Sequence, residues 1–430
     1  MCVNNNMKRK SNSELMDYEQ VRLSMSRTLE DNRPVNGTQI ESFIRVHSIS
    51  SKIKQCERLD LLVETLDSEL EHHARVQFFD KAVPRMVNVL YKINPGPMDT
   101  LVDKFRNHKR ELTLSRSEIA CILANAFFCS YPDDTNINFS ELYSRSYGCG
   151  FNKEKIKCAV TYFNEVFGNG DQKMLQERVT FKRNTILTIP DLMNSTEPII
   201  PLNVIPGGSI RKAFEMAQVN FANKFIGGDV LGSTCLREEM WFITCPELIV
   251  SRFFSKEMEA NEAIIVEGVL QYVDFRDANS YFTCQGPMAK SAFRGPHTVI
   301  SIDAMDFSNG INEIEQYTKP YVDRELVKAF AGFSGTTAKV IASGNWGGGC
   351  FNGDSVLKAK IQMIAASQAG KALYYFAFSK NELIKKLEND VLTGDNFFPQ
   401  TVGKAYRHLL RFASQLYNEK KRCSSFNWHH

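Results

Sequence analysis

The sequence predicts an α/β domain preceded by an all-helical accessory domain, and three observations support this. From about residue 56 to 175, apolar residues recur at helical spacing. From about residue 176 onward, short β-rich runs alternate with helical ones, which is typical of a sheet with helices on both faces. Two glycine-rich loops come at points where ligands usually bind in such sheets, beyond the carboxyl ends of strands.

The composition is that of an ordinary soluble globular protein. The chain has 430 residues, of which 43% are hydrophobic and 23% are charged, and its length suits about two to three domains. The formal net charge of +3 is too small to indicate nucleic acid or an anionic membrane as a partner. No apolar run approaches the ~20 residues that span a bilayer. We therefore expect no membrane association and no direct nucleic-acid binding.

The eleven cysteines are expected to be free thiols. None forms a C-x-x-C pair, their number is odd, and no secretory signal is recognisable at the N-terminus. These features indicate a reducing compartment, so we expect the protein in the nucleus, the cytoplasm or both. No group of side chains has metal-ligand spacing, so we expect no metal, and we expect no cofactor.

Residues 1–55 are rich in Asn, Ser, Arg and Glu and contain few aromatic residues. This composition predicts a disordered or loosely attached tail. Residues 56–190 form the expected helical domain. Leucines between residues 59 and 70 suit one helix face, Pro84 fits the first turn of a second helix, and 153–167 reads as an amphipathic helix.

Another helix in this region has a clear start signal. Ser115 and Glu118 have the spacing of a capping box, and the apolar run 119–128 follows them. That run is apolar nearly all round, so we expect it to be the buried centre of a helical bundle.

Residues 191–425 form the expected α/β domain. The predicted strands are Glu262–Glu267, Thr298–Ile302, Lys339–Ser343 and Leu373–Phe378. The predicted helices are Arg237–Phe242, Tyr321–Ala331, Ser355–Gln368, Lys380–Leu387 and Gly403–Tyr417.

The stretch 219–239 is the first candidate functional site. It runs from an apolar segment through Gly227 and Gly228 to the adjacent carboxylates Glu238 and Glu239. Backbone N–H groups freed by glycines can hold a phosphate, and carboxylates beside a bound sugar can do acid–base work at a glycosidic carbon. The simpler interpretation is that both acids stabilise a helix N-terminus.

The second candidate is the stretch 342–354. Gly347, Gly348 and Gly349 let the backbone fold closely around a ligand, and a helix that begins at Ser355 adds N–H donors for a phosphate. Phe351 can stack on a sugar or a base. The alternative is a flexible surface loop.

These motifs make the chain resemble the poly(ADP-ribose) glycohydrolase family. The matching pieces span about 115–415 and include Val219-Asn220-Phe221-Ala222-Asn223-Lys224-Phe225, Glu238-Glu239, Pro246-Glu247-Leu248-Ile249, and Gly344-Asn345-Trp346-Gly347 to Gly353-Asp354. The resemblance implies a macrodomain, a mixed sheet between helices, with a helical accessory domain before it. It implies cleavage of ribose–ribose O-glycosidic bonds in poly(ADP-ribose), also on ADP-ribosylated proteins, with ADP-ribose as the product.

The resemblance also implies roles for individual residues. Glu239 takes the place of the general acid and Glu238 that of the residue that holds ribose hydroxyls, with Asn220 as a third catalytic position. The positions that it assigns to substrate binding are Asn223, Gly227, Gly228, Asp229, Arg237, Ile210, Asn345, Gly347, Gly348, Gly349, Cys350 and Phe351.

The chain departs from the family pattern at three positions of the first stretch. Asp229 replaces a glycine, Arg237 a glutamine and Asn220 a common aspartate, and Arg211 after Ile210 stands where the family commonly has an acid. A charge at Asp229 would repel a diphosphate unless it points away or pairs, for example with Arg237. Two alternatives therefore stay open: an inactive ADP-ribose-binding pseudoenzyme, and a scaffold that binds a protein partner.

Overall fold

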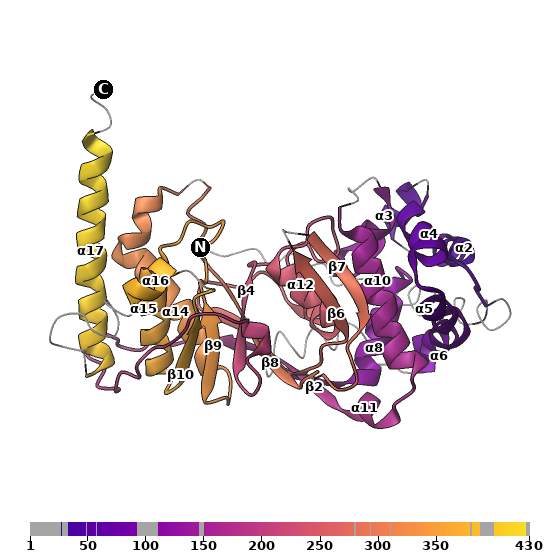
Figure 1. Cartoon of the computed structure of the whole chain (residues 1–430), viewed down its shortest axis with the longest axis horizontal. Helices are drawn as coiled ribbons and strands as arrows, with labels where there is room; N and C mark the ends of the chain where they lie inside the picture. The colour runs from indigo at the N-terminus through magenta and orange to yellow at the C-terminus, as the bar shows by residue number, and fades with distance from the viewer. Residues whose placement is uncertain are drawn as a thin grey trace, which may run out of the picture.

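The computed structural model describes residues 27, 33–48, 50–56, 58–92, 111–145, 150–278, 281–292, 294–309, 311–378, 381–387 and 400–426. Its N-terminal half is mainly helical and lies at one end of an elongated molecule, and the α/β part with the long helix α17 lies at the other end (Figure 1). None of the helices in the described ranges is long and apolar enough to cross a membrane.

The helical part begins within the stretch that was expected to be a loose tail. Its α-helices are α2 (Gly37–His47), α3 (Ser51–Gln55), α4 (Asp60–Glu64), α5 (His72–Gln77), α6 (Val83–Lys92), α8 (Arg116–Phe127), α9 (Ser140–Tyr143), α10 (Asn152–Phe163) and α11 (Gln172–Gln176). π-Helical turns extend three of them, at Thr65–Glu69, Phe78–Ala82 and Asn164–Gly168, and a 3₁₀ turn lies at Asp133–Thr135.

The expectation of a loose tail is wrong for residues 37–55. Ile40 and Ile44 of α2 are fully buried. The carboxylate of Asp133 accepts hydrogen bonds from the Ser51 N–H (2.9 Å) and the Ser50 hydroxyl (2.5 Å). Two buried isoleucines and one carboxylate acceptor, Asp133, thus hold this polar segment against the rest of the helical part. Residues 1–26 and 28–32 of the expected tail lie outside the described residues.

Of the two predicted helix starts in the helical part, the one at Ser115 is confirmed. Ser115 and Glu118 form the capping box, in which the Glu118 N–H donates to Ser115 and the Ser115 N–H to Glu118. Helix α8 is buried on nearly all sides, as its composition predicts. Pro84 is the second residue of α6, but α6 continues directly from the π-helical turn Phe78–Ala82, so the predicted helix start at Pro84 is wrong.

An eight-stranded mixed sheet forms the centre of the α/β part. Its order is β1-β2-β5-β8-β4-β9-β10-β3, antiparallel from β1 to β8 and parallel from β8 to β3. Its strands are β1 (Glu111–Ser115), β2 (Arg178–Thr185), β3 (Asn203–Ile205), β4 (Ala217–Ala222), β5 (Glu262–Val269), β8 (His297–Asp303), β9 (Val340–Gly344) and β10 (Ala372–Phe376). A separate hairpin consists of β6 (Val273–Ala278) and β7 (Tyr281–Pro287).

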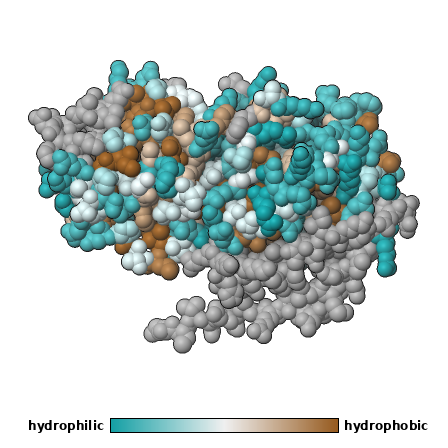
Figure 2. Space-filling view, turned by 90° about the horizontal axis from the view of Figure 1, so that it is seen from below, coloured by the Kyte–Doolittle hydropathy of each residue, from teal (hydrophilic) through white to brown (hydrophobic). Residues whose placement is uncertain are grey.

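Helices cover both faces of this sheet. They are α12 (Arg237–Thr244), α13 (Ser251–Phe254), α14 (Lys319–Ser334), α15 (Ser355–Gln368), α16 (Asn381–Leu387) and α17 (Val402–Phe426), with 3₁₀ turns at Ile210–Lys212, Pro246–Val250 and Glu313–Tyr317. The described surface is largely hydrophilic with scattered apolar patches in the view from below (Figure 2).

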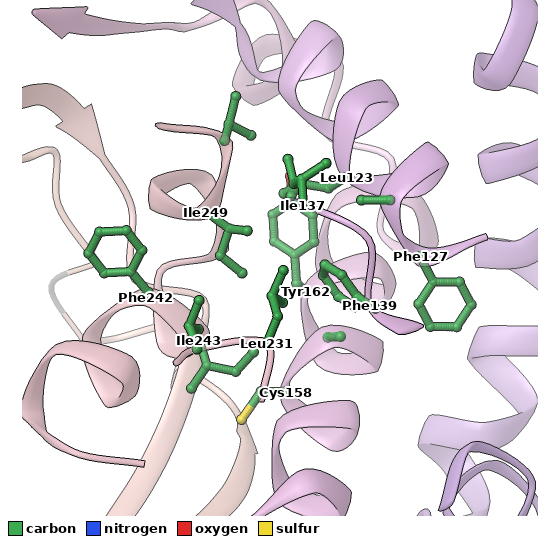
Figure 3. Packing of buried hydrophobic residues seen from close by; sticks show 14 of the residues in the cluster. Leu123, Phe127, Ile137, Phe139, Cys158, Tyr162, Leu231, Phe242, Ile243 and Ile249 are labelled. Carbon is green, nitrogen blue, oxygen red and sulfur yellow. The ribbon is translucent and has the colours of Figure 1, made fainter. Parts of the chain in front are cut away.

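Alternating side chains of the strands supply two separate cores. On β5, Ile264 and Val266 join the core shared with the helical part, whereas Ala263 and Ile265 join the core under α14 and α15. The first core continues across the junction, where Tyr162 of the helical part lies near Ile243 and Ile249 (Figure 3). The two parts therefore share one hydrophobic core.

Strands β1 and β2 lie within the stretch 56–190 but belong to the central sheet. Their buried side chains, Leu112 and Leu114 on β1 and Val179 and Phe181 on β2, alternate with more exposed ones. This period-2 pattern is short, and the helical signals around it obscured it. The expected boundary at residue 190 therefore does not separate helices from sheet.

A buried ion pair fastens the helical part to the α/β part. The Arg116 guanidinium at the start of α8 pairs with Glu247, and both side chains are at most 2% exposed. The Tyr272 hydroxyl (2.6 Å) and the Leu270 N–H (3.0 Å) also donate to the Glu247 carboxylate. A second Arg116 nitrogen donates to the Gly268 carbonyl (2.7 Å). The third Arg116 nitrogen, Nε, donates to Glu177 (3.2 Å), so all polar atoms of the buried pair have partners.

Glu247→Gln is expected to destabilise the protein strongly, because it leaves the buried Arg116 charge with the largely exposed Glu177 carboxylate (3.2 Å) as its remaining counter-charge. The expected loss is about 3–5 kcal/mol. Glu267→Gln is the matched control, since Glu267 of β5 pairs with Lys182 of β2 (2.8 Å), where both side chains are partly exposed, and its loss should cost about 1 kcal/mol or less. Urea unfolding midpoints measure both. Equal shifts for the two variants would contradict the structural role of the buried pair.

Candidate active site

A pocket opens at the carboxyl ends of β4, β8, β9 and β10, where ligands bind in sheets of this kind. Its volume is about 470 Å³. Ten of the predicted site residues line it: Asn223, Arg237, Glu238, Glu239, Asn345, Gly347, Gly348, Gly349, Cys350 and Phe351. The walls also include Phe221, Ala222, Leu236, Ala304, Trp346 and Phe378, which the sequence did not single out as ligand contacts.

Glu238 is held on both carboxylate oxygens. Its Oε1 accepts from the Gly227 N–H (2.8 Å) and from Asn220 Nδ2 (3.2 Å), and its Oε2 accepts from the Asn223 N–H (2.7 Å). Burial raises the pKa of Glu238 to about 8, and the two backbone donors act in the opposite direction. A side chain fixed by three donors is suited to hold a ligand hydroxyl in one orientation.

Glu239 is held on one oxygen and not on the other. Its Oε1 accepts from the Asp229 N–H (3.0 Å). Its Oε2 is buried and has no hydrogen-bond partner in the described part of the chain. Because a buried polar atom without a partner is unfavourable, this oxygen is the group in the pocket that a ligand atom can best satisfy.

The segment 223–229, here called the glycine turn, brings these donors to the two carboxylates. Gly227 and Gly228 have φ values of +83° and +50°, which favour glycine. A Cβ atom on Gly228 would lie 2.4 Å from Glu239 Oε1. The turn therefore needs glycine at this position both for its backbone conformation and for its contact with the acid.

The N–H groups of Gly227, Gly228 and Asp229 in the glycine turn, which were expected to hold a phosphate, already have hydrogen-bond partners within the protein. The Gly227 and Asp229 N–H groups donate to Glu238 and Glu239, and the Gly228 N–H donates to the Phe225 carbonyl (3.0 Å). Gly227, Gly228 and Asp229 do not appear in the pocket lining. The N–H donors of the turn therefore position carboxylates rather than a phosphate.

The three departures from the family pattern occupy distinct places. The Asp229 carboxylate accepts from the Thr234 N–H (2.8 Å) and does not pair with Arg237. Asn220 is buried behind the pocket, where its amide donates to Glu238 and to Ser301 Oγ (3.1 Å). The Asp229 charge, which was expected to repel a diphosphate, is thus partly compensated by a backbone N–H donor.

Arg237 is an exposed residue of the pocket wall. Its guanidinium lies 5.5 Å from the centre of the Phe378 ring. No carboxylate lies within ion-pairing range of it among the residues that the structure describes. Phe378 itself has φ +53°, a strained value for a residue other than glycine. The position of Phe378 just after β10 was the available sequence signal for a pocket residue.

The loop 345–354, here called the triple-glycine loop, forms the opposite wall. Gly347 has φ +72°, its carbonyl accepts from the Gly353 N–H (2.9 Å), and the Gly348 N–H donates to the Asn345 carbonyl (2.9 Å). Asp354 then caps α15 by accepting from the first N–H groups of that helix. Among the described residues, the N–H groups of Gly349, Cys350 and Phe351 have no hydrogen-bond partner, so these donors of the loop suit a bound phosphate.

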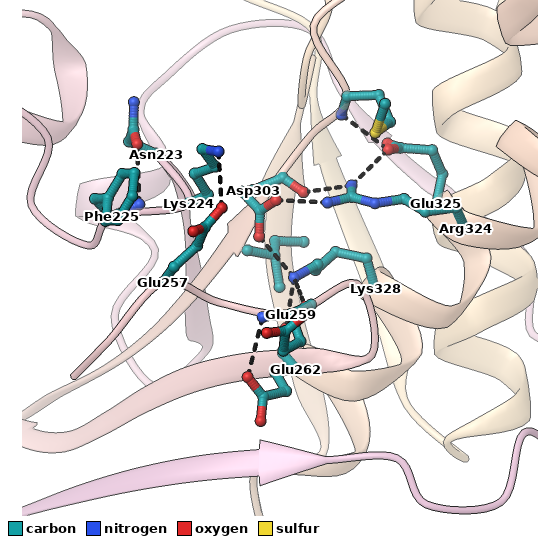
Figure 4. A network of polar contacts seen from close by, with 12 residues as sticks. Asn223, Lys224, Phe225, Glu257, Glu259, Glu262, Asp303, Arg324, Glu325 and Lys328 are labelled. Atoms are coloured by element: carbon teal, nitrogen blue, oxygen red, sulfur yellow. Dashed lines mark hydrogen bonds and ion pairs between the residues drawn. The ribbon is translucent and has the colours of Figure 1, made fainter. Parts of the chain in front are cut away.

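A buried ion network lies beneath this loop. Asp303, at the end of β8, pairs with Arg324 and Lys328 of α14 (Figure 4). Lys358 of α15 pairs with Glu325, and its ammonium lies 4.5 Å from the centre of the Trp346 ring. The network ties α14 and α15 to the strand ends that support the pocket floor.

Ile210 is not brought to the pocket. It lies in the 3₁₀ turn Ile210–Lys212 and is buried in the core shared with the helical part. Arg211 donates to Thr244 Oγ1 (2.6 Å), and its guanidinium lies 4.7 Å from the centre of the Phe275 ring. Among the described residues, no group of three or more His, Cys, Asp or Glu side chains is arranged to hold a metal ion.

Two family models match the chain. The model for the poly(ADP-ribose) glycohydrolase macro domain fold matches residues 189–385, and the model for the helical domain of the same family matches residues 70–183. Together these stretches are more than half of the chain. They agree with the predicted fold class, a macrodomain preceded by a helical domain.

Individual relatives carry the same name. The chain is 26% identical to a probable poly(ADP-ribose) glycohydrolase 2 of Arabidopsis thaliana, over 84% of this chain and 83% of that protein. It is 28% identical to poly(ADP-ribose) glycohydrolase 1 of Caenorhabditis elegans, over 64% of this chain and 37% of that protein. A solved poly(ADP-ribose) glycohydrolase structure from Thermomonospora curvata aligns with 12% identity and a TM-score of 0.31, over 72% of this chain and 94% of that chain. From the two family models, the chain belongs to the poly(ADP-ribose) glycohydrolase family.

Proposed function

We propose that the protein hydrolyses the ribose–ribose O-glycosidic bonds of poly(ADP-ribose) and releases ADP-ribose. The observation that carries this proposal is the asymmetry of the two acids. Both oxygens of Glu238 are held by donors, whereas the buried Oε2 of Glu239 has no partner. A glycosidase that uses one acid needs one proton-carrying oxygen that is free to meet the leaving group.

The reaction follows from this arrangement in two proton transfers. The protonated Oε2 of Glu239 gives its proton to the bridging ribose oxygen as the bond to the anomeric carbon breaks. Glu238 accepts a hydrogen bond from a hydroxyl of the same ribose and holds the ring as positive charge develops on it. The Glu239 carboxylate then takes a proton from the water that attacks the anomeric carbon, which restores the acid.

The triple-glycine loop supports the other end of the substrate. Its free backbone N–H donors suit the diphosphate of ADP-ribose, while Phe351 and Phe378 line the pocket as flat apolar surfaces for a sugar or base. The apolar walls also exclude water, which strengthens each polar contact with the substrate.

The partners and the compartment are part of the proposal. ADP-ribosylated proteins that carry the polymer are the expected macromolecular substrates. The eight cysteines whose side chains the structure describes are free, which supports a reducing compartment, the nucleus or the cytoplasm.

Glu239→Gln is expected to keep ADP-ribose binding but to lose at least about 100-fold in turnover, since the amide cannot donate the acid proton. Labelled polymer reports release, and calorimetry with ADP-ribose reports binding. Glu257→Gln is the matched control, because Glu257 is an exposed acid that pairs with Lys224 (2.7 Å) outside the pocket. Wild-type protein that binds polymer and releases nothing would reject the proposed function. Full turnover by the Glu239 variant would reject the role of that residue alone.

Arg237→Gln is expected to weaken ADP-ribose binding by about tenfold, because the substitution removes a charge-assisted contact with phosphate. Raising the salt concentration should weaken binding to the wild type more than binding to the variant. Lys224→Gln is the control, since this cation also lies over a phenylalanine, Phe225, but outside the pocket lining. Equal affinity and equal salt dependence of wild type and Arg237 variant would show that Arg237 does not contact phosphate.

A further inference from the structure

Arg252 lies directly behind the glycine turn. It belongs to the short helix α13, and its Nη1 donates to the Gly228 carbonyl (2.6 Å) and, at longer range, to the Ile226 carbonyl (3.4 Å). Its Nε donates to the Asn136 carbonyl (3.1 Å), which comes from the helical part. Among the described residues, no carboxylate pairs with this guanidinium, so backbone carbonyls are its main partners.

Those two carbonyls belong to the peptide groups that hold the catalytic acids. The Gly228 carbonyl and the Asp229 N–H are the two ends of one planar peptide group, and that N–H donates to Glu239 Oε1. The Ile226 carbonyl and the Gly227 N–H are the ends of another, and that N–H donates to Glu238 Oε1. One guanidinium nitrogen therefore contacts the far ends of both peptide groups.

Such an arrangement acts on both the geometry and the charge of the acids. A cation at the carbonyl end of a peptide group polarises it, so that the N–H end becomes a stronger donor to a carboxylate. Two peptide groups that share one fixed donor also cannot rotate independently. Gly227 leaves room for this contact, because a Cβ atom there would lie 3.3 Å from Arg252 Cδ.

We propose that Arg252 is a positioning residue that orients Glu238 and Glu239 through the peptide groups 226–227 and 228–229. The proposal deepens the proposed function and rests on it for its effect on turnover. It gives the N–H donors of the glycine turn a single anchor. Arg252 touches neither the pocket lining nor a reacting atom, so its action on the reaction is indirect.

Other charges near the two acids are fixed by their own contacts. Lys155 of α10 donates to the Asp229 (3.0 Å) and Gly232 (2.7 Å) carbonyls. Glu141 of α9 pairs with Lys52. Asp229 accepts from the Thr234 N–H, and Arg237 lies on the opposite side, over Phe378. None of these groups contacts the Ile226 and Gly228 carbonyls, so a substitution at Arg252 isolates its own contribution.

The decisive experiment compares R252Q and R252K with the wild type. In R252Q the lost positive charge is expected to raise the pKa of the Glu239 carboxyl, because a nearby cation favours the ionised form. Isotope-edited infrared titration reads this pKa directly, as the difference between each protein and the same protein carrying E239Q. R252K keeps the charge and should retain a carboxyl pKa close to that of the wild type.

Turnover supplies a second readout. We expect kcat of R252Q to fall about 10- to 100-fold, with the alkaline limb of the pH–rate profile moved to higher pH and ADP-ribose affinity little changed. R183Q is the control, because Arg183 also donates to two backbone carbonyls, those of Lys256 and Glu257, and pairs with Glu262, but contacts neither of the two peptide groups that hold the acids. It should leave both the carboxyl pKa and the pH profile unchanged.

An unchanged Glu239 carboxyl pKa in folded R252Q would overturn the proposal, as would a change equal to that in R183Q. A wild-type protein that releases no ADP-ribose would reject the proposed function instead. The infrared titration still decides on Arg252 in that case, because it does not depend on turnover.

Discussion

The geometry of the site depends on one constraint: the backbone N–H groups of the glycine turn point at two carboxylates. Asn223 and Gly227 supply the donors for Glu238, and Asp229 supplies the donor for Glu239. Strand β4 fixes where the turn begins, and the start of α12 fixes where the acids stand. Because the two residues are neighbours on a helix, their side chains project in different directions. The turn therefore holds one acid on both oxygens and the other on one, which gives them different chemical tasks.

The helical part is a structural component of this site. Lys155 of α10 donates to two carbonyls of the turn region, and the Asn136 carbonyl accepts from Arg252. Both cations lie behind the turn: Lys155 comes from the helical part, and Arg252 comes from the α/β part but also donates to a carbonyl of the helical part. Burying such charges is unfavourable unless their donors are used, and here the carbonyls of the turn use them. The shared core and the Arg116–Glu247 pair keep the helical part in the position that these contacts require.

The sequence was sufficient for long, regular elements and for the main chemical groups. Helix α15 has the predicted bounds, Ser355–Gln368, because Asp354 caps its first turn and a run of apolar residues extends along its length. The adjacent acids Glu238 and Glu239 and the triple-glycine loop were also recognisable from their residue types. The short strand β1 and the docked helix α2 were missed, because their signals extend over few residues and depend on contacts far away in the chain.

The partners of individual hydrogen bonds could not be predicted from the sequence. Freed N–H groups in a glycine turn suit a phosphate or a carboxylate equally well, and only the fold decides which anion reaches them. Asp229 was expected to meet a diphosphate or Arg237, but a backbone N–H five residues further on is its partner. Ile210 was assigned to the substrate from the family pattern, yet its side chain is part of the core.

A crystal structure of the Glu239→Gln variant with a bound fragment of poly(ADP-ribose) tests the division of labour between the two acids most directly. The account predicts that the side chain at position 239 lies within hydrogen-bond distance of the bridging ribose oxygen, while Glu238 contacts a ribose hydroxyl. It also predicts that the diphosphate lies against the triple-glycine loop. A structure in which Glu238 faces the bridging oxygen, or in which the diphosphate binds the N–H groups of the glycine turn, would contradict it.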